Sequence, residues 1–160
     1  MGAMTITTQG HNVSWISSGS GDVPPGAVWA GKDSDGGDIY VGRASHEGDM
    51  LPAKVVPRHG GAFVSWGGEE HSKFSYEVLC CSNVAWERSS HGHVPYGAIE
   101  AGRTSSGEPL FIGRVLHNGT LTPGKIHPSH RMCYIPFGGQ EIPFDSYEDS
   151  CVKPPNNDSE

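Results

Sequence analysis

Nine histidines, four cysteines and 18 acidic residues are the side chains of this 160-residue chain that could bind a metal or catalyse a reaction. No four His and Cys residues have the spacing of a structural zinc site, and the aspartates at 33–38 lack the ligand order of an EF-hand. No stretch resembles a nucleophile elbow or a catalytic Cys/His pair, although two carboxylates facing one bond would suffice for a glycosidase. We therefore expect no metal, no cofactor and no enzymatic activity.

The elements that must position polar side chains come in two copies. A shift of 71 positions places Trp15 on Trp86, and about 26 of the 66 residue pairs between positions 15 and 80 are identical. Such duplication decides the fold, and a polar residue present in one copy only is the better candidate for a site. A unit of about 70 residues buries too little apolar surface to be stable alone, so the copies should share a core.

The domain organisation follows from the duplication. We expect a first repeat at residues 13–82, a second repeat at residues 84–153, and flexible ends at residues 1–12 and 154–160. The ends are polar, and chain ends are where order is commonly lost.

The composition and the turn residues predict an all-β fold. The chain has 23 Gly and 12 Pro, which favour many turns over long helices. The segments 38–44 and 109–116 are rich in β-branched and aromatic residues, which favour strands. The second of these runs into Asn118-Gly119, the strongest short signal for a β-hairpin. We expect no helix longer than a turn or two.

The last strand of the second copy should differ from that of the first. Asp149 and Ser150 replace Val78 and Leu79, which predicts a shorter and more exposed strand. The next position is cysteine in both copies, Cys80 and Cys151, which favours two similar buried thiols over a disulfide.

The charge excludes one large class of partners. The formal net charge is −7, and the 11 Lys and Arg residues are spread along the chain, whereas nucleic-acid-binding proteins present a basic patch or stripe. No apolar run has the length of a transmembrane helix, and no signal peptide is visible. We therefore expect no nucleic-acid partner, no transmembrane segment, and a protein that is cytoplasmic or secreted by a non-classical route.

A series of short motifs recurs in the same order in both copies. In the second copy they read PYGAIEAG, FIGRVL, GTLTPGKIH, YIPFGGQE and SYE. This ordered set resembles the DM-nine repeat, a family that includes small mannose-specific tandem-repeat lectins of invertebrates and modules of natterin-like toxins. The resemblance covers roughly residues 15–150. It implies two intertwined antiparallel β repeats, often a homodimer, and binding of mannose-containing glycans, including microbial surface polysaccharide, in innate immune recognition.

The resemblance also implies which residues bind the sugar. These are an Asp shortly after the AxAG turn and a Lys in the Pro-x-Lys segment, which correspond to Asp33 and Lys54. The second copy has Lys125 but Thr104 in place of the acid, so its site is expected to be altered.

Two glutamates beside the Gly-Gly bends complete the candidate set. Glu70 and Glu141 recur in both copies and are either further sugar contacts or residues that cap the backbone or pair with a base. Glu69 stands where the family often has Lys, which changes the charge beside the bend.

Charged groups suit this ligand because water already satisfies the hydroxyl groups of a sugar. A carboxylate accepts from two adjacent hydroxyls and an ammonium donates to them, and each such bond contributes about 1.5–3 kcal/mol. One site would bind a single mannose weakly, so several sites must act together. Asp33 and Lys54 lie on opposite sides of the segment 38–43, which begins a hairpin, so we expect their side chains to meet.

The competing function is a structural or protein-interaction module that has lost sugar binding. Thr104 and Glu69 favour it, because both depart from the family pattern. Residues kept in both copies favour structural roles, and we expect Arg43 and Arg114 to form ion pairs with repeated glutamates.

Overall fold

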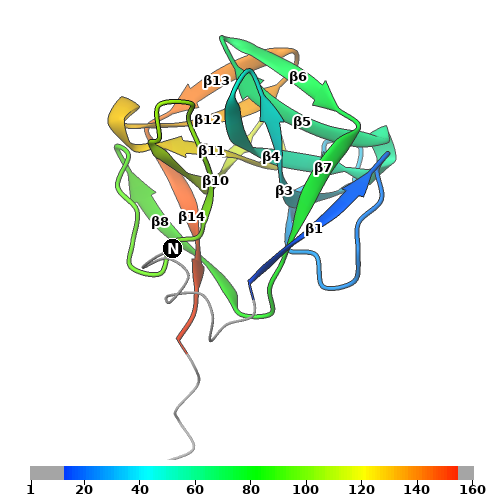
Figure 1. Ribbon diagram of the computed structural model, residues 1–160, viewed down its shortest axis with the longest axis horizontal. Helices are drawn as coiled ribbons and strands as arrows, with labels where there is room; N and C mark the ends of the chain where they lie inside the picture. Colours follow the sequence, from blue (N-terminus) through cyan, green and yellow to red (C-terminus); the bar gives the residue numbers. More distant parts are fainter. Residues whose placement is uncertain (1–12, 155–160) are drawn as a thin grey trace, which may run out of the picture.

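The computed structural model describes residues 13–154, which form 14 strands and two short 3₁₀ helices (Figure 1). The first repeat contains β1 (Ser14–Gly19), β2 (Trp29–Lys32), β3 (Asp38–His46), β4 (Asp49–Val56), η1 (Pro57–His59), β5 (Gly61–Trp66), β6 (Glu69–Lys73) and β7 (Ser75–Cys80). The second contains β8 (Val84–Ser90), β9 (Glu100–Arg103), β10 (Pro109–His117), β11 (Thr120–His127), η2 (Pro128–His130), β12 (Met132–Phe137), β13 (Gln140–Phe144) and β14 (Ser146–Val152). The all-β prediction is confirmed, and no helix within residues 13–154 exceeds a single turn. The ends predicted to be flexible, apart from residue 154, lie outside the described residues.

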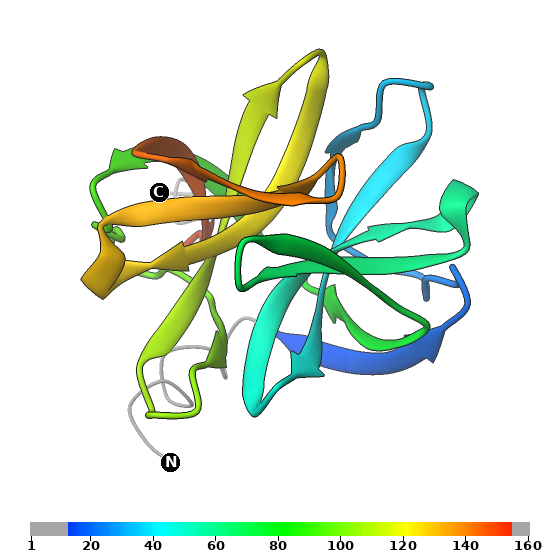
Figure 2. The same ribbon diagram turned by 90° about the horizontal axis from the view of Figure 1, so that it is seen from above.

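All strands belong to one antiparallel sheet. Equivalent strands of the two repeats follow one another in the same order from its two ends. The order is β1-β7-β3-β4-β5-β6-β13-β12-β11-β10-β14-β8, with β2 paired to β3 and β9 paired to β10 and β4. Figure 2 shows the green β5–β6 and orange β12–β13 hairpins side by side where the repeats meet. The ladder between the repeats there is the single pair Gln140↔Glu69.

The two repeats are intertwined because a short strand of each lies beside a strand of the other, β9 beside β4 and β2 beside β11. β9 of the second repeat pairs with β4 of the first through Met50↔Arg103. Arg114 donates to the Ala30 carbonyl of β2 at 2.7 Å, and Arg43 donates to the Ala101 carbonyl of β9 at 3.2 Å.

Two of the three apolar clusters contain residues of both repeats: Leu110 of the second repeat joins a cluster otherwise built from the first, and another cluster is shared evenly. The buried members of the evenly shared cluster are Val28, Ala30, Val41 and Leu79 from the first repeat and Ile99, Ala101, Ile112 and Val152 from the second. Separating the repeats would expose this cluster to water, with a free-energy cost of about 25 cal/mol for each Å² of apolar surface exposed. The shared core expected from the size of one repeat is therefore present.

The predicted hairpin turn at Asn118-Gly119 joins β10 to β11. Both residues have positive φ, 50° and 79°, as the tight turn between twisted strands requires. Glu47 and Gly48 adopt the same conformation between β3 and β4, with φ of 52° and 83°.

The prediction of a shorter, exposed last strand in the second repeat is wrong. β14 has seven residues against six in β7, and Asp149 and Ser150 are fully buried. A continuous ladder with β8 holds the backbone of β14, so the side chain of Asp149 faces inward as that of Val78 does in β7. Burial, and secondarily the charge of Glu87, raises the pKa of Asp149 to about 8, so the buried group is mainly the neutral acid at pH 7.

All four cysteines lie within the described residues, and none forms a disulfide. Cys151 is buried, as predicted, whereas its equivalent Cys80 is half-buried. Burial raises the pKa of Cys151 to about 12. Among residues 13–154, no helix is long and apolar enough to cross a membrane.

Candidate functional site

The repeated arginines form the ion pairs expected of them. Arg43 Nε lies 2.7 Å from Glu77 Oε1, and Arg114 Nε lies 2.7 Å from Glu148 Oε1. Each guanidinium also lies 4.2 Å from the centre of a tryptophan ring, Trp15 in the first repeat and its equivalent in the second. These residues support the fold and leave the site to others.

The lysine proposed for the first sugar site is buried at the junction of the repeats. Lys54 Nζ lies 3.2 Å from Glu70 Oε2, and the two side chains are only 9% and 13% exposed. The ammonium also lies 5.6 Å from the ring centre of Phe63 and 5.5 Å from that of Phe137. Its charge is therefore neutralised and held between two aromatic rings.

The second lysine is also paired with a glutamate and near an aromatic ring, and it contacts the backbone of the other repeat. Lys125 Nζ lies 2.8 Å from Glu141 Oε2 and donates to the Ser65 carbonyl of the first repeat at 2.8 Å. The ring centre of Tyr134 lies 5.6 Å from the ammonium. Lys125 thus links its own repeat to the backbone of the other.

The two glutamates both cap backbone and pair with a base. Glu70 Oε1 accepts from the Gly139 N–H at 2.7 Å, and Glu141 Oε1 accepts from the Gly68 N–H at 2.9 Å. Each carboxylate therefore binds a lysine of its own repeat and the Gly-Gly bend of the other. The two structural roles that the sequence left open for these residues occur together.

Asp33 opens the turn between β2 and β3. Its N–H donates to the Gly37 carbonyl at 2.8 Å, and its carbonyl accepts from the Gly36 N–H at 2.9 Å. Asp33 Oδ1 accepts from the Ser34 N–H at 2.9 Å, whereas Oδ2 lies 3.9 Å from His59 Nδ1 in η1. The fold thus brings a residue of this turn beside the 3₁₀ helix.

Asp35 lies on the other side of the same imidazole. Asp35 Oδ2 is 3.4 Å from His59 Nε2, and Arg58 Nη1 lies 3.6 Å from Asp35 Oδ1. The hydrogen bond from the Gly37 N–H is the main cause that lowers the pKa of Asp35. The carboxylate is therefore charged at neutral pH.

Asp33, Asp35 and His59 are the residues among positions 13–154 whose donor types and spacing would suit a divalent cation. One ligand atom from each lies within 4.8 Å of the others. The Arg58 guanidinium already pairs with one of the two carboxylates and would oppose a cation there.

Asp33 and Lys54 do not form an ion pair with each other in the described structure, although the sequence led us to expect that they meet. Lys54 is opposite Val41 in the β3–β4 ladder, whereas the β2–β3 ladder ends at Lys32↔Asp38, just before Asp33. Three residues of strand separate these positions, which is about 10 Å at 3.3 Å per residue.

A continuous row of side chains nevertheless connects the two. The His59 and Phe63 ring centres lie 6.4 Å apart, edge to face, and Phe63 in turn faces Lys54. We call the row Asp33, His59, Phe63, Lys54 and Glu70 the first-repeat face. It presents a carboxylate at one end, an aromatic ring in the middle and an ammonium paired with a glutamate at the other end.

The second repeat has an equivalent row without the acid. We call the row His130, Tyr134, Lys125 and Glu141 the second-repeat face. His130 Nδ1 lies 3.0 Å from the Tyr134 hydroxyl, and Thr104 occupies the position of Asp33. The two faces therefore differ in charge and in hydrogen-bonding groups.

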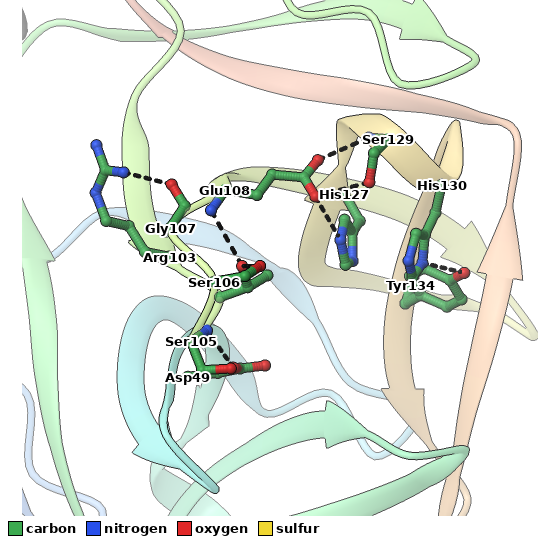
Figure 3. A network of polar contacts seen from close by, with 11 residues as sticks. Asp49, Arg103, Ser105, Ser106, Gly107, Glu108, His127, Ser129, His130 and Tyr134 are labelled. Carbon is green, nitrogen blue, oxygen red and sulfur yellow. Dashed lines mark hydrogen bonds and ion pairs between the residues drawn. The ribbon is translucent and has the colours of Figure 1, made fainter.

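A different carboxylate ties the turn to the 3₁₀ helix in the second repeat (Figure 3). Glu108 Oε1 lies 3.0 Å from His127 Nε2 and accepts from the Ser129 hydroxyl at 2.7 Å, while Oε2 accepts from the Ser129 N–H at 2.7 Å. Burial alone would raise the pKa of Glu108, but the bonds from Ser129 and the charge of His127 lower it. His127 is stacked on His130 with ring centres 3.5 Å apart, and burial is the main cause that lowers the pKa of His127.

The aromatic members of both faces and this network were not predicted from the sequence. The aromatic pair Phe63 and Tyr134 recurs at equivalent positions, which was a usable signal. Glu108 stands in one copy only, where the other has Gly37, and this is the pattern expected of a specialised residue.

Comparison with known proteins places these features in a family. The DM9 repeat model matches residues 33–144, well over half of the chain. Natterin-4 of Thalassophryne nattereri is 27% identical over 140 residues, which is 85% of this chain and 33% of that protein. The nematode sperm cell motility protein MFP2B has a crystal structure that superposes with a TM-score of 0.63 at 16% identity, over 92% of this chain and 48% of that one. The chain thus spans about a third of the first relative and about half of the second, whose likeness shows the fold alone. On the strength of the family match, this chain belongs to the DM9 repeat family.

Proposed function

We propose that the chain is a carbohydrate-binding protein that recognises mannose-type glycans without a metal and without catalysis. The observation that supports this most is the position of the Phe63 ring, which lies between the His59 ring and the Lys54 ammonium. His59 in turn lies beside Asp33. An apolar surface flanked by charged hydrogen-bonding groups matches a hexose, which has an apolar C–H face and hydroxyl groups around its rim.

Each group on the first-repeat face would contact a different part of the sugar. The Asp33 carboxylate would accept from neighbouring hydroxyls, and the ring of Phe63 would cover the C–H face. Lys54 and Glu70 already satisfy each other at 3.2 Å, so they would act as one neutral pair that offers a donor and an acceptor at the other rim.

The second-repeat face would be a weaker or differently selective site. It keeps Lys125 and Glu141 but has Thr104 instead of the acid, so one charge-assisted bond is lost. A difference of this kind is worth about 1.5–3 kcal/mol, or about tenfold in affinity or more. Two unequal sites in each chain, multiplied in a homodimer, would raise the avidity for a surface that carries many glycans.

The proposal includes a biological setting. Recognition of microbial surface polysaccharide in innate immunity fits a weak, multivalent site for mannose. We propose a cytoplasmic or non-classically secreted protein for this role, with no nucleic-acid partner.

A protein-interaction module is the second candidate. Lys54 and Lys125 are only 7% and 6% exposed and are paired with glutamates, so both could serve solely to join the repeats. This alternative predicts no binding to any glycan.

Retention on immobilised mannose separates the two candidates. The wild-type protein should bind, elute with free mannose, and bind equally well with a chelator present, because the face holds charged groups of its own. Asp33→Thr, which introduces the residue of the second repeat, should weaken binding about tenfold or more.

The matched control is Asp145→Asn, which changes an acid that is 61% exposed and lies outside both faces. It should bind as the wild type does. No retention of the wild type on mannose or on a broad glycan array would overturn the proposed function and favour the interaction module. Loss of retention with chelator would contradict the metal-free site and direct attention to Asp33, Asp35 and His59.

A further inference from the structure

We propose that Trp29, Lys32 and Asp38 form a second carbohydrate subsite, which binds another pyranose of the glycan held at the first-repeat face. The subsite rests on the function proposed above and specifies its ligand as an oligosaccharide. All three residues lie on the β2–β3 hairpin, whose turn carries Asp33.

Trp29 presents a fixed aromatic surface to solvent. It is 45% exposed, whereas the other three tryptophans of the chain are only partly so. Its indole N–H donates to Asp38 Oδ1 at 2.9 Å, which fixes the plane of the ring. A ring that is already oriented loses little conformational entropy when a ligand stacks on it.

The carboxylate that orients the ring also offers a binding group. Lys32 Nζ lies 3.0 Å from the same Oδ1 atom, so both contacts use one oxygen and leave Oδ2 as an acceptor. The side chains of Lys32 and Asp38 are 58% and 43% exposed. The hydrogen bonds from Trp29 and then Lys32 lower the pKa of Asp38, so it is charged and can accept from two hydroxyls.

The spacing along the hairpin suits consecutive sugars. Lys32↔Asp38 is the last ladder pair before the turn, and Trp29↔Tyr40 is two residues further along β3. Two strand residues span about 7 Å, so Trp29 lies roughly one sugar ring beyond the turn that holds Asp33. A linear glycan could therefore extend from the first-repeat face along the outer side of β2.

The second repeat shows that the fold does not require this group. Glu100, Arg103 and Pro109 occupy the equivalent positions, and Arg103 pairs with Glu100 at 3.1 Å. The same backbone therefore carries an ion pair in one repeat and an exposed aromatic ring with a carboxylate in the other. Polar and aromatic residues present in one copy only are free to serve a ligand.

The chemistry favours a sugar over a cation. An indole face attracts cations as well as apolar C–H groups, but the Lys32 ammonium beside Asp38 would repel a positive ligand. A pyranose combines an apolar face for the indole with hydroxyls for Asp38 Oδ2 and the Lys32 ammonium.

The test compares methyl α-mannoside with a linear mannotriose by isothermal titration calorimetry. Stacking and two hydrogen bonds should make the triose bind about tenfold more tightly to the wild type, which corresponds to about 1.4 kcal/mol. Trp29→Gln keeps an N–H donor for Asp38 but removes the ring, so it should abolish this advantage while leaving the affinity for methyl α-mannoside unchanged. Trp29→Phe should keep most of the advantage, and Glu100→Gln in the second repeat is the matched control.

Tryptophan fluorescence gives a readout at the subsite itself. Acrylamide reaches Trp29 most easily, so the triose should reduce quenching and the monosaccharide should not. Binding of the monosaccharide with no advantage for the triose, or an advantage that survives in Trp29→Gln, would overturn the subsite and leave the proposed function intact. Failure of the wild type to bind either sugar would overturn both.

Discussion

Asp149 shows how one residue can differ between repeats without changing the backbone around it. It stands where the first repeat has Val78, in a fully buried position, and neither carboxyl oxygen has a hydrogen-bond partner in the described structure. Burying a polar group without a partner costs free energy, and burying its charged form costs more. The second repeat therefore carries a destabilising group that the first does not.

Asp149→Val should stabilise the protein and remove part of its pH dependence. The folded-state pKa is about 8 and the ordinary value is 3.8, so the folded state holds the proton more tightly. The free energy of unfolding should therefore fall as pH rises from about 4 to about 8 and then level off. At pH 7, Asp149 should have lowered the free energy of unfolding by on the order of 4 kcal/mol relative to its value below pH 4. Urea denaturation from pH 5 to 9 measures it as the difference between the wild type and the variant.

Val is the residue of the first repeat at this position, so the variant should keep the fold. Asp145→Asn, an exposed change, serves as the control. Parallel pH profiles for the wild type and Asp149→Val would show that Asp149 does not titrate in this way.

Residue types predicted some contacts but not the geometry of the site. The ion pairs of Arg43 and Arg114 were predictable because each arginine recurs with a recurring glutamate. The separation of Asp33 from Lys54 was not, because it depends on where the β2–β3 ladder ends relative to the β3–β4 ladder. Ladder register is a property of paired strands and is not visible in the spacing of two residues along one chain.

The β2–β3 turn and its equivalent between β9 and β10 have one backbone and two sets of side chains. In the first repeat, the Asp33 N–H donates to the Gly37 backbone carbonyl at 2.8 Å, and in the second the Thr104 N–H donates to the Glu108 backbone carbonyl at 2.9 Å. Strands and turns of this kind were predictable from glycine and β-branched residues. The partner of each turn was not, since η1 and η2 are distant in sequence from the turns that they contact.

Exchanging the turn should separate binding from stability. Replacing residues 33–37, DSDGG, with TSSGE from the second repeat should keep the backbone hydrogen bonds of the turn. It removes the two carboxylates beside His59 and places one glutamate at position 37, near Arg58. The melting temperature should stay within a few degrees, since substitutions that preserve the local conformation typically cost about 0.5 kcal/mol or less. Mannose affinity should fall about tenfold or more.

Calorimetry gives the melting temperature and retention on mannose compares the affinities, both measured on the same preparation. The reciprocal exchange, TSSGE to DSDGG at residues 104–108, is the control for stability. It should lower the melting temperature more, because Glu108 alone ties its turn to Ser129 and His127. An exchanged first turn that binds mannose normally would exclude Asp33 from the site.

The whole molecule depends on contacts that cross between its halves. The shared apolar cluster, the β4–β9 ladder and the two glutamate caps all join residues of different repeats. Duplication in the sequence predicted a shared core, because one repeat is too small to fold alone. It did not predict that a short strand of each repeat would lie beside the other repeat, since this depends on three-dimensional packing.

Residues 13–82 alone should therefore fail to fold, and the intact chain should unfold in a single transition. Leu79, Val41 and their neighbours would lose the second half of their cluster, and Glu70 would lose the bend that it caps. Circular dichroism of the isolated first repeat and differential scanning calorimetry of the whole chain test this. A folded isolated repeat, or two resolved transitions, would show that the halves are independent.

The reciprocal glutamate caps carry a consequence for how such chains can grow. Glu70 caps the bend at Gly139, and Glu141 caps the bend at Gly68, so the bend of each repeat depends on a glutamate of the other repeat. A third copy added to the end would find both existing bends already occupied and its own left open to water. Longer proteins built on this plan should therefore gain repeats two at a time, because the unit that can be duplicated is the pair of repeats.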